Sequence, residues 1–393
     1  MKLQSISFVN NYSLKIFTLI IFLLFGCKKE SETPVQPVAE RSSWKLNVLY
    51  FRAEKILLNS FASKDTLTIA GFNSISLFDT STLNPSRRVF ANDFSSMAFK
   101  PVFGNNFWMY GGANGVQFVL FSPVYLRGNT TSALPFFWGL RLHDLDSSYS
   151  VKTVALPNYY TNPIGAFNSK GQFLSAVSDT DGCSFCLIDL HTSYSPSYAG
   201  ILASISPAVT KIKLNGNDKY ISYVPFISSY KDNYFVSSNQ GNYIVYPNGS
   251  YRKLTVSSGS FVDMFNIHDT LYSLTSNAEL FRSLDNGENW AHFAGNFPSS
   301  FSRHFMIGEK VYFYVYSQLF SADLSTGKIQ EIDNTGLEYN EITSVNMFGD
   351  KVLVTTLSGL FYKPISEFLM YKTPATASKG PNRIESKRLE LHQ

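Results

Sequence analysis

The fold is decided by a pattern that is clearest in the stretch EKVYFYVYSQLFSADLSTG (309–327). A turn of polar residues or glycine leads into an apolar strand, a turn of small residues and a second strand, and a further such turn ends the unit. Four other stretches repeat this unit: DTLTIAGFNSISLFD (65–79), DNYFVSSNQGNYIVY (232–246), DTLYSLTSNAELFRSLD (269–285) and DKVLVTTLSGLFYKP (350–364). Two looser copies are NNFWMYGGANGVQFVLF (105–121) and GQFLSAVSDTDGCSFCLIDL (171–190).

The spacing of the units predicts the architecture. The leading apolar residues of the first strands are Leu67, Phe107, Phe173, Tyr234, Leu271, Val311 and Val352, which are 40, 66, 61, 37, 40 and 41 residues apart. A period near 40 residues with about four short strands is typical of a β-propeller blade. The two wide gaps require insertions, which we place at Pro123–Phe137 and within 191–230. We therefore expect an all-β propeller of seven blades, with six or eight left open.

Helical periodicity is nearly absent between residues 44 and 372, and turn residues recur every 8–12 positions. A two-sheet sandwich is the rival fold, but it would show no 40-residue period. The stretch Trp44–Phe51 is a candidate strand for closing the ring with the last blade. We assign the propeller to 44–372 and expect a loose tail at 373–393, which has no aromatic residue.

The composition agrees with buried strands. Of the 393 residues, 16% are aromatic and only 16% charged, with a net charge of +4. These values exclude a disordered chain and a coiled coil, and they give no support for a nucleic-acid partner. Inner strands of a blade are covered on both faces, so a stretch such as Val311–Val315 can be apolar at every position.

The first 26 residues resemble a secretory signal of the bacterial lipoprotein type. Lys2 and Lys15 precede the short apolar run Ile16–Gly26, which is too short to span a bilayer. The run ends in Leu-Phe-Gly-Cys at 24–27, which resembles a lipobox. The resemblance implies cleavage before Cys27 and acylation of Cys27, and an anchor of several acyl chains holds a protein on a membrane.

The residues that follow indicate a tether and a location. The segment 27–43 has no aromatic residue and two prolines, so we expect a flexible tether. Lys28 stands where an aspartate would retain a lipoprotein in the inner membrane, so we expect the outer membrane. Lys28-Lys29-Glu30 resembles the start of lipoproteins of Bacteroidetes-type bacteria. Periplasmic and cell-surface placement both stay open, and either compartment is oxidising.

One motif resembles a known family. Ser283, Asp285, Gly287 and Trp290 match the Asp box, Ser-x-Asp-x-Gly-x-x-Trp, and stand where the pattern places the hairpin between a blade's third and fourth strands. The chain here resembles sialidase-like propellers with Asp-box (BNR-type) repeats. In that family the box is a folding element at the rim, so the resemblance implies a fold and no activity. A degenerate copy follows at 321–327, Ser-Ala-Asp-Leu-Ser-Thr-Gly.

The sequence offers no clear set of catalytic residues. A sialidase clamps a carboxylate with three arginines, and no such triad can be placed among Arg52, Arg127, Arg141, Arg252, Arg282 and Arg303. The six histidines are scattered, so we predict no metal site and no cofactor. Asp144 and Asp146 could bind Ca²⁺, but a solvated turn is the preferred interpretation.

Cys183-Ser-Phe-Cys186 is a sharper feature. With Cys27 acylated, these are the remaining thiols of the chain. The interpretation that we prefer is a short structural disulfide, with two thiols or a redox pair as alternatives.

We therefore expect a non-catalytic envelope lipoprotein that is anchored in the membrane at Cys27 and whose propeller is a protein-interaction or assembly module. The alternative is a surface lipoprotein that binds or hydrolyses glycans in the sialidase manner. Rings in the insertions, at Tyr125–Phe137 and Tyr159–Tyr160, are candidate contacts.

Overall fold

The computed structural model describes residues 43–372 except 53, 63–65, 73, 80–84, 91–101, 105–106, 112–116, 123–135, 142–148, 154–164, 180–181, 198–199, 257–258 and 300–301. The chain divides into two compact units, Met1–Ser42 and Ser43–Gln393, and the described residues all belong to the second. The predicted signal, nearly all of the tether and the tail therefore lie outside the described residues.

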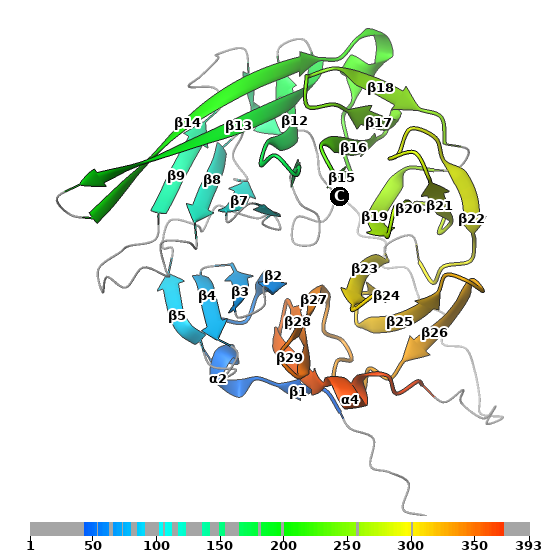
Figure 1. The fold of residues 1–393 in the computed structure, drawn as a ribbon. Helices are drawn as coiled ribbons and strands as arrows, with labels where there is room; N and C mark the ends of the chain where they lie inside the picture. The colour runs from blue at the N-terminus through cyan, green and yellow to red at the C-terminus, as the bar shows by residue number, and fades with distance from the viewer. Residues whose placement is uncertain are drawn as a thin grey trace, which may run out of the picture. The chain divides into compact units, whose positions relative to one another are not determined.

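The described residues of the second unit form seven antiparallel sheets (Figure 1). Four of them, in chain order, are β2 (Leu57–Ala62), β3 (Thr66–Gly71), β4 (Ser74–Asp79) and β5 (Pro85–Phe90); β6 (Val102–Gly104), β7 (Phe107–Gly111), β8 (Gln117–Ser122) and β9 (Phe136–Arg141); β10 (Tyr149–Thr153), β11 (Gly165–Phe167), β12 (Phe173–Asp179), β13 (Gly182–Ser197) and β14 (Gly200–Lys213); and β15 (Phe226–Tyr230), β16 (Asn233–Ser238), β17 (Gly241–Val245) and β18 (Tyr251–Leu254).

The other three sheets are β19 (Phe261–Ile267), β20 (Thr270–Thr275), β21 (Leu280–Ser283) and β22 (Ala291–Ala294); β23 (Arg303–Ile307), β24 (Lys310–Val315), β25 (Gln318–Asp323) and β26 (Lys328–Ile332); and β27 (Ile342–Phe348), β28 (Lys351–Thr356), β29 (Gly359–Pro364) and β1 (Lys45–Leu46). Short helices α2 (Val48–Phe51), η3 (Gly216–Tyr220) and α4 (Ile365–Phe368) connect or follow strands.

Neighbouring sheets contact one another through β11 of the five-stranded sheet and through the first strands of the four-stranded sheets. β11 contacts β15, β15 contacts β19, β19 contacts β23, β23 contacts β27, and β27 contacts β2, which joins the last sheet to the first. Six sheets have four strands and one has five. The predicted all-β propeller is confirmed.

Hydrophobic packing between the sheets explains the apolar strands. In β24, Val311, Phe313 and Val315 belong to a cluster with residues of β19–β22, whereas Tyr312 and Tyr314 belong to a cluster with residues of β27–β29. Neighbouring residues of a strand point to opposite faces, so both faces of β24 are covered. This is the double burial that the sequence predicted for Val311–Val315.

The ring is closed by a shorter strand than expected. Only Lys45 and Leu46 of the predicted closing strand Trp44–Phe51 pair with β29. The strand stops because the Asn47 side chain accepts a hydrogen bond from the Tyr50 N–H at 3.0 Å and caps α2. The prediction was therefore correct for the partner strand and wrong for the length.

Strands β13 and β14 form a hairpin that continues beyond β12. β12 pairs with β13 as far as Ile188, while the β13–β14 pairing continues to Ser197 and Gly200. The predicted insertion at 191–230 therefore contains strand. Among the described residues, the structure holds no helix of the length and apolar character needed to span a membrane.

Candidate functional site

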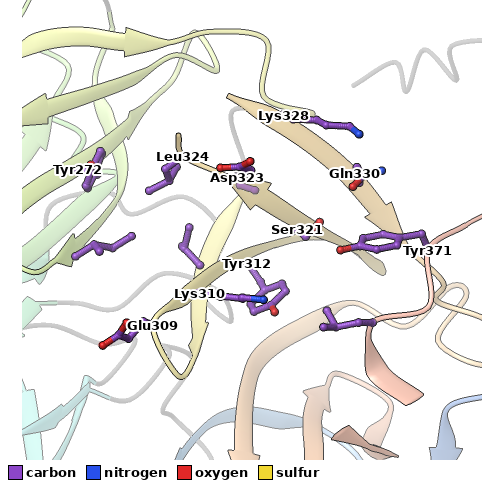
Figure 2. Close-up of a pocket in the computed structure, with 14 residues that line it drawn as sticks. Tyr272, Glu309, Lys310, Tyr312, Ser321, Asp323, Leu324, Lys328, Gln330 and Tyr371 are labelled. Carbon is purple, nitrogen blue, oxygen red and sulfur yellow. The ribbon is translucent and has the colours of Figure 1, made fainter. Parts of the chain in front are cut away.

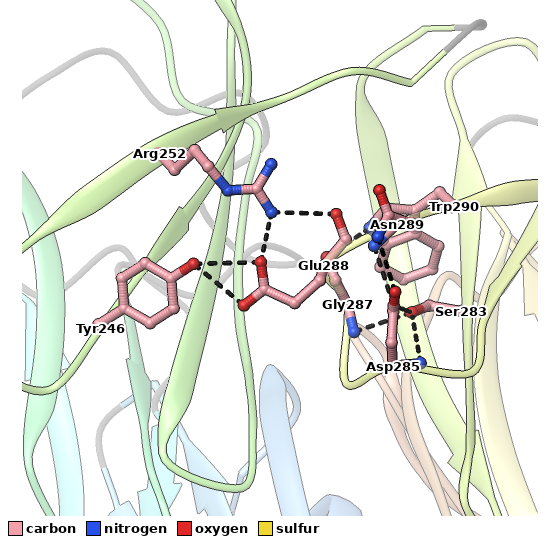
Figure 3. Close-up of polar contacts among 8 residues, drawn as sticks. All are labelled: Tyr246, Arg252, Ser283, Asp285, Gly287, Glu288, Asn289 and Trp290. Atoms are coloured by element: carbon pink, nitrogen blue, oxygen red, sulfur yellow. Dashed lines mark hydrogen bonds and ion pairs between the residues drawn. The ribbon is translucent and has the colours of Figure 1, made fainter.

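The Asp-box hairpin lies between β21 and β22, the third and fourth strands of their sheet, as the sequence predicted. Its polar side chains bond to the hairpin itself (Figure 3). The Ser283 hydroxyl donates to Asp285 Oδ1 at 2.7 Å and accepts the Gly287 N–H at 2.8 Å. Asp285 also accepts the Asn289 N–H at 2.9 Å and the Asn289 amide at 2.8 Å. These bonds hold the pKa of Asp285 at about 2, with the backbone bond from Asn289 as the largest cause.

Gly287 and Trp290 join the hairpin to hydrophobic neighbours. Gly287 has φ of 92°, and a Cβ there would stand 2.2 Å from the Phe235 ring of the preceding sheet. The Trp290 ring lies 4.9 Å from Phe261 and 6.1 Å from Phe235, and its Nε1–H donates to the Gly287 carbonyl at 2.9 Å. Only glycine fits both the backbone conformation and the close approach.

Glu288 joins the hairpin to β18 and the turn before it. The carboxylate accepts the Tyr246 hydroxyl at 3.0 Å and forms an ion pair with Arg252, whose guanidinium also donates to the Glu288 carbonyl at 3.0 Å. Figure 3 shows the three side chains converging between the two sheets. The hydrogen bonds of Ser283 and Asp285 thus stay within the hairpin, and those of Glu288 reach the preceding sheet.

The degenerate copy forms the equivalent hairpin between β25 and β26 but is built differently. Asp323 accepts the Ser325 N–H at 2.9 Å, the Ser325 hydroxyl at 2.6 Å and the Thr326 hydroxyl at 2.8 Å. These bonds hold the pKa of Asp323 at about 2, and the Ser325 hydroxyl is the largest cause. Counted from the serine of each box, Ser325 stands at the glycine position and Lys328 at the tryptophan position. Lys328 therefore replaces the docking ring, and Leu324 of this hairpin packs against the core cluster with β19–β22.

An open pocket of about 630 Å³ lies beside this hairpin (Figure 2). We call it the rim pocket; its lining is Ile267, Tyr272, Glu309, Lys310, Val311, Tyr312, Ser321, Ala322, Asp323, Leu324, Lys328, Gln330, Leu369 and Tyr371. Five lining residues pack in the core cluster with β19–β22: Ile267, Tyr272, Val311, Ala322 and Leu324. The opposite face of the β24–β26 sheet carries the polar lining residues Tyr312, Ser321, Asp323, Lys328 and Gln330. Sequence analysis missed this pocket because Leu369 and Tyr371 reach it from beyond β29.

Four exposed tyrosines lie at the other end of the sheets. The connections from a second to a third strand, and from a fourth strand to the next sheet, all leave an antiparallel four-stranded sheet at the same end. Tyr220 and Tyr223 lie in the β14–β15 connection, Tyr316 in the β24–β25 turn and Tyr339 in the β26–β27 loop. We call these residues the tyrosine face. The Asp-box hairpin and the rim pocket lie at the opposite end.

Cys183 and Cys186 are buried thiols on β13. They pair in regular register with Ser178 and Ser175 of β12. Three residues along a strand span about 10 Å and reverse the face, whereas a disulfide joins Cα atoms less than about 7 Å apart. The structure therefore disagrees with the predicted disulfide, because an extended strand holds the two sulfurs apart.

Several predicted contacts lie outside the described residues: Cys27, Tyr125–Pro135, Asp144, Asp146, Tyr159 and Tyr160. Within the described part of the chain, no three His, Cys, Asp or Glu side chains are grouped in a way that could hold a metal ion. His304 instead contacts the buried Asp263 at 2.9 Å, between the inner strands β23 and β19. That contact lowers the pKa of Asp263 against the opposing effect of burial, which is the largest single influence.

Comparison with known proteins supports the fold. Neither protein-family models nor curated proteins give a match. Among solved structures, the extracellular domain of the hybrid two-component system BT4673 from B. thetaiotaomicron is similar, at 11% identity and a TM-score of 0.50, over 81% of this chain and 39% of that one. PorZ, a surface component of the type-IX secretion system of Porphyromonas gingivalis, shares 9% identity over 86% of this chain and 40% of its own, with a TM-score of 0.45.

A third solved structure, YCF48 bound to D1 peptide, shares 12% identity over 86% of this chain and 98% of its own, with a TM-score of 0.48. This chain thus spans about two fifths of the first two structures and nearly the whole of the third. At these identities the likeness concerns the fold alone.

Proposed function

We propose that this chain is a cell-envelope lipoprotein of the sialidase-like, Asp-box type, and that its propeller is a non-catalytic protein-interaction module. The observation that carries the proposal is the left-handed backbone of two residues of the tyrosine face. Tyr316 and Tyr339 have φ of 51° and 65°, a region that costs a bulky residue about 1–3 kcal/mol. Glycine or asparagine would adopt this conformation at lower cost.

Burial does not offset that strain. Tyr339 is fully exposed and Tyr316 is 59% exposed, so neither ring gains much from the interior. The two loops that carry them are joined by the Ile342 N–H, which donates to the Tyr316 carbonyl at 2.8 Å. Exposed tyrosines on a rigid scaffold supply large contact area at low entropic cost, and tyrosine is enriched in binding hot spots. A protein partner explains why the strain is retained.

Site-specific crosslinking tests the module. A photo-reactive phenylalanine analogue at position 339 or 316 should yield a defined protein adduct in intact cells. The same analogue at Leu284, which is 74% exposed in the Asp-box turn, is the matched control and should not. Equal adducts from all three positions, or turnover of a sialoside by the purified protein, would count against the proposal.

The anchor has a separate test. Cys27→Ala should move the protein from the membrane fraction to the soluble fraction, because acylation needs the thiol. Continued membrane retention of that variant would exclude the proposed lipid anchor without affecting the interaction module.

A further inference from the structure

The face of the β24–β26 sheet that turns toward α4 carries two rows of polar side chains. Tyr312, Ser321 and Gln330 are direct cross-strand neighbours, and Asp323 stands opposite Lys328. Residues two apart on a strand share a face, and directly opposed residues lie side by side. All five side chains therefore project from one surface into the rim pocket (Figure 2).

The last sheet leaves this surface open. Its outer strand β1 has only two residues, whereas the other four-stranded sheets end in strands of at least four. The segment after α4 forms a wall instead. The Asp333 N–H donates to the Met370 carbonyl at 2.7 Å and the Lys372 N–H donates to the Glu331 carbonyl at 3.1 Å, which fixes Tyr371 opposite Ile332. The Tyr371 ring is 45% exposed.

The polar groups differ in how firmly they are held. Tyr312 stacks on Phe305 at 5.3 Å and meets Phe368 at 5.4 Å, and burial raises the pKa of its hydroxyl, so it stays a donor. Asp323 is fixed by the hairpin. The side chains of Ser321, Gln330, Lys310 and Lys328 form no hydrogen bond or ion pair with the part of the chain that the structure describes. The pocket thus combines fixed groups with groups that can accept and donate to a ligand.

The charge balance restricts the ligand. Lys310 and Lys328 are matched by Glu309 and Asp323, and no arginine is present in the lining. A carboxylate or phosphate ligand is usually clamped by arginine forks. A peptide anchored by apolar side chains needs an open apolar slot. Most of the apolar lining packs in the core cluster with β19–β22, and Leu369 is the one exposed large aliphatic residue of the described lining. What remains is a neutral surface of hydroxyl, amide, ammonium and carboxylate groups beside an exposed ring.

From this arrangement we propose that the rim pocket binds a neutral oligosaccharide. The Tyr371 ring stacks against an apolar sugar face, and Gln330, Ser321 and Lys328 exchange hydrogen bonds with its hydroxyls. The pocket volume is in the range of small-molecule sites. The site goes beyond the proposed protein-interaction function, since it lies at the opposite end of the sheets from the tyrosine face and uses none of its residues.

The test is an array of neutral and acidic glycans probed with the mature chain, followed by calorimetry with the neutral hits. Tyr371→Ala and Gln330→Ala should each weaken neutral-glycan binding by about tenfold or more, about 1.4 kcal/mol. Lys328→Gln, which keeps a donor, should change it little. Tyr339→Ala on the tyrosine face is the matched control and should bind normally. The side chains of Tyr371, Gln330 and Lys328 are exposed, so thermal unfolding of the three pocket variants should stay close to that of the parent protein.

Three results would overturn the proposal. These are the absence of any neutral glycan among the hits, a preference for acidic glycans that Lys328→Gln abolishes, and neutral binding that survives both pocket variants. Loss of partner crosslinking at position 339 would leave neutral-glycan binding intact, so the two functions fail separately.

Discussion

The Asp-box hairpin at 283–290 and the hairpin of its degenerate copy at 321–327 occupy equivalent places in neighbouring sheets. Both hold an aspartate by hydrogen bonds from the turn. Only the first also inserts a ring between sheets and pairs a carboxylate with an arginine of the preceding sheet. Where the second has Lys328 in place of the tryptophan, the rim pocket lies open. The aspartate thus shapes both turns. The first turn packs a tryptophan ring between sheets, whereas the second packs Leu324 against the core cluster with β19–β22.

The largest difference in the free energy of unfolding should lie between alanine variants of Gly287 and Gly327. Gly287→Ala should destabilise the fold by roughly 3 kcal/mol, because the new Cβ meets the Phe235 ring at 2.2 Å and keeps a left-handed φ. Gly327→Ala, with φ of 69° and its nearest neighbour at 4.0 Å, should cost only about 1 kcal/mol. Urea unfolding of both variants measures the gap, and equal losses would show that the close approach is unimportant.

The tryptophan position should give the next effect. Trp290→Ala removes contacts with Phe235 and Phe261 and should cost about 2–3 kcal/mol, less than for a fully buried ring. Lys328→Ala should be neutral within about 0.5 kcal/mol. Thermal unfolding of the Trp290→Ala and Lys328→Ala variants measures how much the residue at this position stabilises each hairpin. If Lys328→Ala lost as much stability as Trp290→Ala, Lys328 would also hold its hairpin against the neighbouring sheet.

Acid should affect the two hairpins alike. The pKa of both Asp285 and Asp323 is about 2 in the folded chain, below the ordinary value of an aspartate. A lowered folded pKa adds stability that is complete above about pH 4 and is lost as the pH falls through about 2. Asp285→Asn and Asp323→Asn should therefore differ from the parent in stability at pH 6 and converge with it near pH 2. A difference that persists at pH 2 would point to a contribution other than charge.

The smallest effect should belong to the ion pair. Glu288→Gln keeps a hydrogen-bonding side chain but loses the charge opposite Arg252, and both partners are more than a third exposed. We expect a loss below about 1 kcal/mol that shrinks further in 1 M salt. Unfolding at low and high salt measures it, with Lys351→Gln as a control for a pair inside one sheet. A loss of stability that is unchanged by salt would indicate that Glu288 stabilises the fold through hydrogen bonding or packing and not through its charge.

The features that could be predicted are local in the chain. The repeats gave the strands because turn residues and apolar runs recur within each unit, and the position of Asp285 and Gly287 in a hairpin followed from the same order. The alternation of strands could also have argued against the Cys183–Cys186 disulfide, since residues three apart face opposite ways.

The features that could not be predicted depend on distant contacts. The rim pocket needs Tyr371 beside β26, although about 40 residues separate Tyr371 from that strand in the sequence. The left-handed backbone of Tyr316 and Tyr339 leaves no mark in residue type, because a tyrosine is the reverse of what such a position favours. The end of the closing strand depended on a single cap by Asn47.

The short closing strand has a mechanical consequence. Ser43 is followed at once by Trp44, whose N–H donates to the Thr335 carbonyl, and then by the two residues of β1 on β29. A pulling force on the chain before Trp44 would act first on the hydrogen bonds of Trp44 and β1, and only then on the longer strands. The seam that closes the ring would thus be the first part to yield under tension.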